Sequence, residues 1–277
     1  MTDKGIIRQA LREDSAAQDI TTRALVPPHA RASAVIIAKE DMCVCGLELV
    51  QGVYAALDKK VRCTTLVKDG AEVSRGRKLI ALKGPARSIL SGERVALNFL
   101  GHLSGVATLT RRYVRRIQGA RAEIYDTRKT TPGLRELEKY AVRCGGGHNH
   151  RTDLASMALI KDNHRMVMRR TAIEEVVKKI KSRTRKTVMV EVDTVAQFKR
   201  ALKSGADVIL VDNMKPSYVR SCLKLRNAQK RKTPLIEASG GITLDNVAHY
   251  AATGIERISI GALTHSAASA DVSLELT

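Results

Sequence analysis

The chain has 277 residues, enough for one large domain or two moderate ones. Hydrophobic residues make up 44% of it and charged residues 27%, an ordinary balance for a water-soluble globular protein. No window approaches the roughly 18 apolar residues that a membrane-spanning helix needs, and residues 1–14 lack the apolar core of a signal peptide. We therefore expect a cytoplasmic enzyme or binding protein with no membrane partner.

The net charge of +20 favours an anionic partner: nucleic acid, an acidic membrane surface, or phosphorylated and carboxylated metabolites. Readers of single-stranded nucleic acid usually offer aromatic faces for base stacking, whereas this chain has no Trp, two Phe and six Tyr. The composition therefore disfavours a nucleic-acid partner and leaves phosphate-only contacts open.

The cysteines are odd in number and form no CxxC or CxxH arrangement, so we expect reduced thiols that hold no zinc. They are Cys43, Cys45, Cys63, Cys144 and Cys222. Cys144 is a candidate nucleophile, but the sequence places no base beside it, and a lone cysteine more often packs inertly.

The first hundred or so residues predict a separate domain of mixed α and β structure. Three β-rich segments joined by glycine-containing turns are predicted strands, at 31–41, 59–70 and 77–84. A helical period runs over 47–57. A long helical stretch follows over 86–117, and we expect Gly101 and Gly105 to interrupt it.

From about Tyr113 the sequence alternates short apolar runs with helical periods, which is typical of repeated β/α units and a parallel sheet. The predicted strands are 122–127, 157–161, 187–193, 206–212, 234–239 and 257–261. Several are nearly continuous apolar runs, as expected of strands buried on both faces. The pattern predicts a barrel-like or doubly wound α/β domain.

Each predicted strand ends in polar, charged or glycine residues, and in parallel α/β domains ligands gather at the carboxyl ends of the strands. In strand order these residues are Thr127, Arg128 and Lys129; Lys161, Asp162 and Asn163; Glu191 and Asp193; Asp212 and Asn213; Ser239, Gly240 and Gly241; and Gly261 with His265. The sequence therefore predicts one binding edge.

The segment 238–243, ASGGIT, brings two glycines and a hydroxyl to a helix expected to begin near Leu244. Backbone N–H groups there can converge on a phosphate, although a glycine-rich turn without a ligand is the alternative. Glu191 and Asp212 supply carboxylates of the kind that hold Mg²⁺ together with substrate phosphates. Each is equally compatible with a salt bridge to a lysine or arginine at the same edge.

His148 and His150 stand two residues apart in a glycine-rich loop, without a third ligand at a recognised zinc spacing. Binding of a substrate carboxylate, or hydrogen bonding within the loop, fits them better. The charge excess separates into two populations. Arg128, Lys129, Arg151 and Lys161 lie at the binding edge, whereas two windows lie in predicted helices outside the barrel: 165–186, with nine Lys/Arg against two Glu, and 220–232, with six Lys/Arg and no acid. We expect solvated helix faces there, with a nucleic-acid or acidic surface as the alternative.

Several segments resemble, in order and spacing, the quinolinate phosphoribosyltransferase family, also called nicotinate-nucleotide pyrophosphorylases (carboxylating). They are TRKTTPGLRELEKYAVRCGGGHNHRTDL (127–154), LIKDNH (159–164), VEVD (190–193), ILVDNM (209–214), EASGGIT (237–243) and ISIGALTHS (258–266), with DITT (19–22) and GERVALNFLGHLSGVAT (92–108) before them. The resemblance covers nearly the whole chain. Relatives of this fold from a molybdenum-associated pathway are the near alternative, and the intact TRKTTPG and HNHR motifs argue against them.

The resemblance implies an α/β protein with two domains. An N-terminal α/β sandwich would span 1–112 and take back 266–277, and an open six-stranded α/β (TIM-like) barrel would span 113–265. It also implies a homodimer in which the neighbour completes each active site. The implied reaction joins quinolinate to 5-phosphoribosyl-1-pyrophosphate with Mg²⁺, giving nicotinate mononucleotide, pyrophosphate and CO₂ in de novo NAD biosynthesis.

The resemblance also implies roles for individual residues. Quinolinate would be held by Arg128, His150, Arg151 and Lys161, together with Arg94 of the partner subunit. The ribose, pyrophosphate and metal would be held by Lys129, Glu191 and Asp212, and the 5′-phosphate by Ser239, Gly240, Gly241 and Gly261, with His265 nearby. The catalytic groups among them would be Lys129, Lys161, Glu191 and Asp212.

Overall fold

The computed structural model describes residues 4–168, 171–229 and 233–277. They form two compact units. The first comprises Met1–Arg111, Thr131–Gly146 and Ser266–Thr277, and the second comprises Arg112–Thr130 and Gly147–His265. Parts of both basic windows, 169–170 and 230–232, lie outside the described residues.

The first unit is built on an antiparallel sheet of strand order β12-β1-β5-β3. Its strands are β1 (Arg31–Ala38), β3 (Arg62–Thr65), β5 (Lys78–Pro85) and β12 (Val272–Leu276), and β2 (Met42–Cys43) pairs separately with β4 (Glu72–Val73). The three strands predicted in this region are confirmed. Alternate residues of β1 are buried, which gives this sheet one core face. The C-terminal segment completes the sheet, because β12 pairs with β1.

The helices of the first unit are α1 (Lys4–Glu13), α2 (Ile20–Leu25), α3 (Leu47–Leu57), α4 (Ala86–Arg116) and α5 (Arg135–Cys144), with a 3-10 turn at Ala16–Gln18. The predicted interruption of α4 is wrong, because the helix is continuous. Its glycines instead allow close approach of the C-terminal segment. A Cβ at Gly101 would lie 2.8 Å from the carbonyl oxygen of Ala270, and one at Gly105 would overlap that of Ala268.

The segment 131–146, which includes α5, groups with the first unit, although the sequence placed it within the barrel range 113–265. The physical reason is its contacts. Glu138 accepts from His102 of α4 at 2.9 Å, and Tyr140 donates its hydroxyl to Asp69 at 2.9 Å. Leu137 and Val142 are buried on the same helix.

The second unit is a six-stranded parallel sheet of order β6-β11-β10-β9-β8-β7. Its strands are β6 (Glu123–Tyr125), β7 (Ala158–Ile160), β8 (Val188–Val192), β9 (Val208–Asp212), β10 (Leu235–Ser239) and β11 (Arg257–Ser259). All six predicted strands are confirmed. The curved sheet is open, since β6 and β7 each pair on one side only in the described residues.

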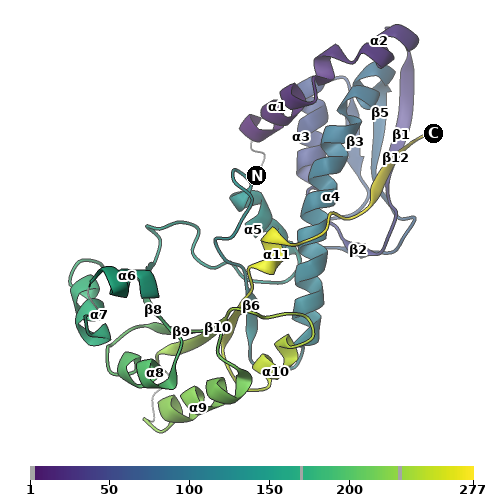
Figure 1. The fold of residues 1–277 in the computed structure, drawn as a ribbon. Coiled ribbons are helices and arrows are strands. Elements are labelled where there is room, and N and C mark those ends of the chain that lie inside the picture. Colours follow the sequence, from purple (N-terminus) through teal and green to yellow (C-terminus); the bar gives the residue numbers. More distant parts are fainter. Residues whose placement is uncertain (1–3, 169–170, 230–232) are drawn as a thin grey trace. The chain divides into compact units, whose positions relative to one another are not determined.

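Helices α7 (Ile173–Lys181), α8 (Val195–Ala201), α9 (Pro216–Asn227) and α10 (Val247–Ala251) cover the outside of this sheet (Figure 1). The short helices α6 (Asp162–Val167) and α11 (Ala262–His265) follow the carboxyl ends of β7 and β11. The apolar runs of β8 and β9 are buried as predicted, and Met189, Val208 and Leu210 form a core cluster. At the amino ends of the strands, Arg226 and Glu256 form a buried ion pair at 2.6 Å.

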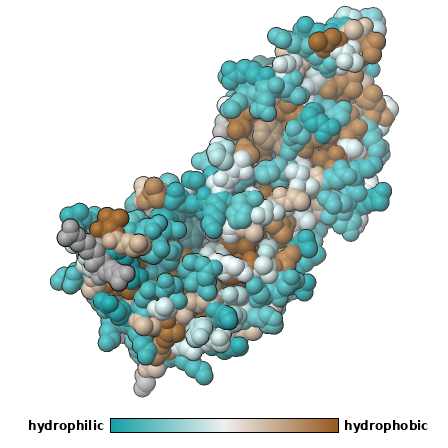
Figure 2. Space-filling view, viewed as in Figure 1, coloured by the Kyte–Doolittle hydropathy of each residue, from teal (hydrophilic) through white to brown (hydrophobic). Residues whose placement is uncertain are grey.

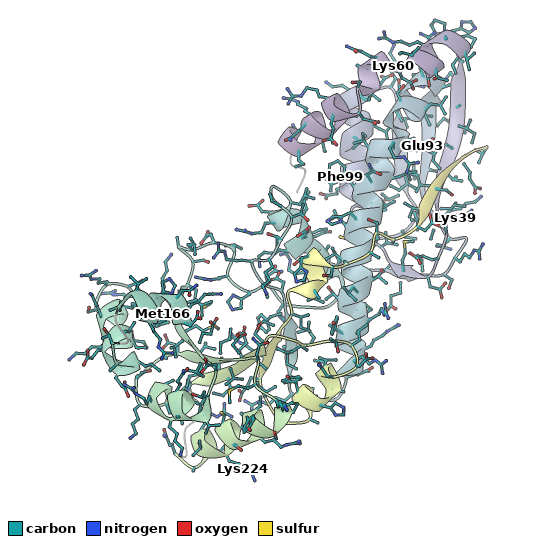
Figure 3. All side chains as sticks on the ribbon, in the orientation of Figure 1. Lys39, Lys60, Glu93, Phe99, Met166 and Lys224 are labelled. Carbon is teal, nitrogen blue, oxygen red and sulfur yellow. The ribbon has the colours of Figure 1, made fainter. Side chains whose placement is uncertain are left out.

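The molecular surface is mostly hydrophilic on the face seen in Figure 2. The described cations of α7 and α9 are largely exposed, as Lys224 illustrates (Figure 3), and some are paired. Lys181 lies 2.7 Å from Asp207, for example. Within the described residues, every helix is either too short or too polar to span a membrane.

Candidate active site

An open cavity of about 620 Å³ lies at the carboxyl ends of the strands in the second unit. All residues to which the family resemblance assigns a role, except Arg94, line it. They are Arg128, Lys129, His150, Arg151, Lys161, Glu191, Asp212, Ser239, Gly240, Gly241, Gly261 and His265. Asp162, Asn163 and Asp193, which were also expected at this edge, do not line it. The strand ends meet here because the six strands are parallel and in register, so that each delivers its following residues to the same edge.

One wall of the cavity is cationic. Arg151 is half-buried and donates Nη1 to the carbonyl of Met157 at 3.0 Å. Burial lowers the pKa of Arg151, the nearby Arg128 guanidinium lowers it further, and Asp153 opposes both. Two guanidinium groups that repel each other beside a cavity make a ready site for carboxylates, because a bound anion relieves that repulsion.

His150 is held by buried acids on both sides. Its backbone N–H donates to Asp126 Oδ1 at 2.8 Å, and its Nδ1 accepts the backbone N–H of Arg151 at 2.8 Å. The ring proton is therefore assigned to Nε2, which lies 3.3 Å from Oε1 of Glu237. Asp126 and Glu237 are both fully buried. The loop is thus oriented from two strands, β6 and β10.

Neither Asp126 nor Glu237 was among the site residues predicted from the sequence. Asp126 directly follows β6 and also accepts from Asn149 Nδ2 at 2.6 Å, while Glu237 lies inside β10. A charged residue within an otherwise apolar buried strand was the available signal, since such a group is rarely buried without a partner.

A second wall carries carboxylates. Glu191 at the end of β8 has its Oε2 3.8 Å from Nζ of Lys161. Burial raises the pKa of Glu191, the charges of Asp212 and Asp162 raise it further, and Lys161 opposes them. Asp212 accepts from Asn213 Nδ2 at 2.8 Å. Glu191 therefore has a lysine partner in Lys161, and its pKa also responds to the charge of Asp212.

The glycine-rich loop after β10 has a backbone that only glycine adopts readily. Gly240 and Gly241 have φ of +86° and +62°, and a Cβ at Gly240 would overlap the side-chain amide of Asn213. Asn246 ties the loop together, accepting from Thr243 N and donating to Gly241 O, both at 2.9 Å. The helix expected near Leu244 begins instead at Val247, because residues 244–246 form turns. The loop residues 239–243, rather than a helix end, line the cavity.

The neighbouring strand end packs closely against Lys129. Thr264 donates its hydroxyl to the Lys129 carbonyl at 2.7 Å. A Cβ at Gly261 would lie 2.9 Å from Cδ of Lys129 and 3.1 Å from Nε2 of His265. Gly261 therefore leaves room for the side chains of Lys129 and His265, which limits where the lysine can extend.

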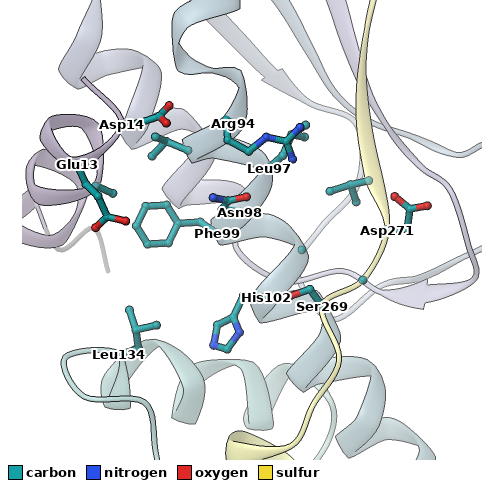
Figure 4. A pocket seen from close by; sticks show the side chains of 15 residues that line it. Glu13, Asp14, Arg94, Leu97, Asn98, Phe99, His102, Leu134, Ser269 and Asp271 are labelled. Atoms are coloured by element: carbon teal, nitrogen blue, oxygen red, sulfur yellow. The ribbon is translucent and has the colours of Figure 1, made fainter. Parts of the chain in front are cut away.

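Arg94 lies elsewhere, in a cavity of about 600 Å³ formed by residues of the first unit (Figure 4). It shares one face of α4 with Asn98 and His102. Glu13 and Asp14 of the N-terminal segment line the same cavity. Within one chain the described residues therefore leave Arg94 out of the barrel cavity.

His148 does not share the environment of His150. Its ring stacks on Tyr125 with centroids 5.3 Å apart, and its Nε2 lies 3.9 Å from Oε1 of Glu123. Both contacts lie at β6, where Tyr125 and His148 also form an isolated parallel bridge. The two histidines therefore have separate structural roles.

Two family descriptions match the chain. "Quinolinate phosphoribosyl transferase, N-terminal domain" matches residues 19–104, and "Quinolinate phosphoribosyl transferase, C-terminal domain" matches residues 106–275. A Bacillus subtilis protein named probable nicotinate-nucleotide pyrophosphorylase (carboxylating) is 41% identical over 276 residues, which covers 99% of this chain and 93% of the relative. A Nicotiana tabacum quinolinate phosphoribosyltransferase (decarboxylating) is 35% identical, covering 99% and 82%.

Solved structures agree with these sequence matches. The nicotinate-nucleotide pyrophosphorylase from Ehrlichia chaffeensis superposes with a TM-score of 0.93 at 33% identity, covering 100% of this chain and 99% of that one. The enzyme of the same name from Francisella tularensis gives a TM-score of 0.89 at 35% identity, covering 100% and 98%.

Proposed function

The chain belongs to the quinolinate phosphoribosyltransferase family, and we propose that its barrel cavity joins quinolinate to 5-phosphoribosyl-1-pyrophosphate. The products are nicotinate mononucleotide, pyrophosphate and CO₂, in NAD biosynthesis. The observation that carries this proposal is the single cavity that collects cations, carboxylates and a glycine-rich loop from all six strand ends. A dicarboxylate and a phosphorylated sugar need all three kinds of group.

Quinolinate is assigned to the cationic wall. Arg128, Arg151 and Lys161 line that part of the cavity and offset the repulsion between two carboxylates and the phosphates of the second substrate. His150 supports this wall by accepting the N–H of Arg151. This assignment orients the pyridine nitrogen toward the phosphoribosyl site, as an attack on the sugar requires.

The 5′-phosphate is assigned to the loop after β10 and to the β11 end, with Ser239, Gly240, Gly241, Gly261 and His265 around it. Glycines at these positions let backbone N–H groups approach a phosphate closely. Lys129, held beside Gly261, is assigned to the pyrophosphate. Its ammonium stabilises the negative charge that develops as pyrophosphate leaves.

Glu191 and Asp212 fit a divalent cation, because the charge of Asp212 raises the pKa of the half-buried Glu191 and a cation would relieve that repulsion. Mg²⁺ held by these two carboxylates and by phosphate oxygens would supply charge neutralisation of the leaving group.

The chemical steps follow from this placement. The pyridine nitrogen forms a bond to C1′ as the bond to pyrophosphate breaks, and the carboxylates stabilise the positive charge that develops on the sugar. When the adjacent carboxylate leaves as CO₂, the electron pair of the broken bond stays on that ring carbon, where the positive charge of the quaternised nitrogen stabilises it, and a proton from water completes nicotinate mononucleotide. The arginines hold that carboxylate in position rather than acting as acid or base.

We further propose a cytoplasmic homodimer in which Arg94 serves the neighbour's site. The support is the position of Arg94 on an exposed cavity of the first unit, together with its place in the GERVALNF segment.

Release of CO₂ from carboxyl-labelled quinolinate tests the proposed reaction. We expect release only when the phosphoribosyl donor and Mg²⁺ are both present, with nicotinate mononucleotide formed in equal amount. Release without the donor, or none with it, would overturn the assignment.

A further inference from the structure

Three cysteines that are scattered in the sequence come together in the first unit. Cys43 and Cys45 lie beside β2, and Cys144 ends α5. The Sγ atoms of Cys45 and Cys144 and a carboxylate oxygen of Asp69 all lie within 4.8 Å of one another. The proposed reaction uses none of these residues, and none of them lines the barrel cavity.

The backbone on both sides of this thiol pair is fixed. Cys45 donates its N–H to Ser104 Oγ at 3.0 Å, and its carbonyl accepts from the same hydroxyl at 3.2 Å. The carbonyl of Cys144 accepts from Arg111 Nη2 at 3.1 Å and from Cys43 Sγ at 3.5 Å. The approach of the two sulfurs is therefore built into the fold rather than arising from a mobile loop.

The two thiols differ in exposure and in chemistry. Cys45 is fully buried, and its contact with Cys144 and its burial raise its pKa. Cys144 is partly exposed, and its contacts with Cys45 and Tyr140 lower its pKa against the opposing effects of burial and Asp69. Of the two thiols, Cys144 therefore has the greater thiolate character, and Cys45 lies beside it in the buried interior.

A metal ion is a poorer occupant of this cluster. The Asp69 carboxylate already accepts the backbone N–H of Gly46 at 3.1 Å and that of Leu47 at 3.2 Å, which caps α3, and it also accepts the Tyr140 hydroxyl at 2.9 Å. The Asp69 carboxylate therefore has few lone pairs left to bind a metal ion, whereas a structural zinc site needs four ligands.

We propose that Cys144 is a site of modification by peroxides and that Cys45 resolves the modified residue as an intrachain disulfide. The Cys144 thiolate attacks one oxygen of hydrogen peroxide, the O–O bond breaks, and hydroxide leaves, giving a sulfenic acid. The Cys45 sulfur then attacks Sγ of Cys144, and the S–O bond breaks. The departing hydroxide takes the Cys45 proton as water, so that two thiols and one peroxide give one disulfide and two waters.

Mass spectrometry of the intact wild-type enzyme after limited hydrogen peroxide treatment tests this proposal. We expect each chain to lose two hydrogens and the peptides containing Cys45 and Cys144 to become joined, with full reversal by dithiothreitol. In Cys45→Ser, Cys144 should accumulate as sulfinic acid instead, because the resolving thiol has been removed. A wild-type enzyme with no joined peptide would overturn the proposal.

Cys63 provides the matched control, because it is a partly exposed thiol in the same unit whose pKa burial raises to about 11. Near neutral pH, iodoacetamide should alkylate Cys144 at least about tenfold faster than Cys63. Cys63→Ser should form the disulfide as the wild-type enzyme does. Equal alkylation rates, or thiols protected from alkylation only when Zn²⁺ is added, would contradict the assignment. This readout is independent of the transferase activity.

Discussion

The imidazole Nε2 of His150 lies 3.3 Å from Oε1 of Glu237, and the two side chains are almost completely buried. Neither Glu237 oxygen meets hydrogen-bond geometry with any described residue, His150 included, so the two side chains meet through an electrostatic contact between the carboxylate and the Nε2–H edge of the ring. Nδ1 of the same ring accepts the backbone N–H of Arg151. His150 therefore links Glu237 of β10 to Arg151 on the cationic wall. We therefore expect Glu237 to act as a positioning residue for the proposed quinolinate site.

Replacement of Glu237 by Gln should weaken quinolinate binding selectively. The amide keeps the size of the side chain, but it removes the charge that orients Nε2–H, and the ring and Arg151 lose their fixed direction. We expect the KM for quinolinate to rise about tenfold, equivalent to about 1.4 kcal/mol, with the KM for the phosphoribosyl donor unchanged. Steady-state kinetics with each substrate varied in turn measures this split.

Glu123→Gln is the matched control, since Glu123 lies on β6 near His148 and is exposed. It should leave both KM values at their wild-type levels. Equal losses for both substrates in Glu237→Gln, or a lower melting temperature with unchanged kinetics, would show that Glu237 has only a structural role.

Replacement of Gly240 by Ala should disrupt phosphate binding. The residue has φ of +86°, and the added methyl group would overlap the Asn213 amide, so the loop must move away from its position. We expect the KM for the phosphoribosyl donor to rise more than about tenfold while quinolinate affinity, measured by calorimetry, stays the same.

Gly254→Ala separates backbone strain from loss of the site. Gly254 has φ of +84° and has open space where a Cβ would lie. Its substitution should therefore lower stability by about 1 kcal/mol without changing either KM. Donor binding by Gly240→Ala at the wild-type level would remove this loop from the phosphate site.

The sequence could predict the strands and the cavity residues because both depend on local pattern and on one topological rule. Apolar runs identify buried parallel strands, and parallel strands bring residues such as Arg128, Glu191 and Asp212 to one edge. The role of Glu237 could not be predicted from the sequence, because it depends on which strand faces the loop that carries His150. The tertiary fold, and not a local pattern, determines that this strand is β10.

Two local predictions failed for similar reasons. Glycine weakens an isolated helix, yet α4 continues through Gly101 and Gly105 because packing of the C-terminal segment requires small residues there. The helix expected near Leu244 begins at Val247, because residues 244–246 form turns that the side chain of Asn246 stabilises. The proximity of Cys45 to Cys144 could not be predicted, because it depends on tertiary packing and not on any local sequence pattern.

Replacement of Asp212 by Asn should raise the Mg²⁺ concentration needed for half-maximal rate. Asp212 is one of two carboxylates on the second cavity wall, and its amide would offer a weaker, uncharged oxygen to the ion. We expect a rise of about tenfold or more with quinolinate affinity unchanged. Asp193→Asn, an exposed carboxylate just beyond Glu191 that does not line the cavity, is the control. An unchanged Mg²⁺ requirement in Asp212→Asn would exclude Asp212 as a ligand.

Replacement of Glu256 by Gln should destabilise the barrel without touching its chemistry. Glu256 Oε1 lies 2.6 Å from the buried Arg226, and its Oε2 accepts the backbone N–H of Ile236 at 3.0 Å. Removing this charge leaves a buried guanidinium without its carboxylate, which costs about 3–5 kcal/mol in such pairs. Urea unfolding measures the loss. Arg121 reaches Glu256 from the surface at 3.4 Å, so Arg121→Ala should cost less than about 1 kcal/mol. Similar losses in the two variants would contradict a dominant role for the buried pair.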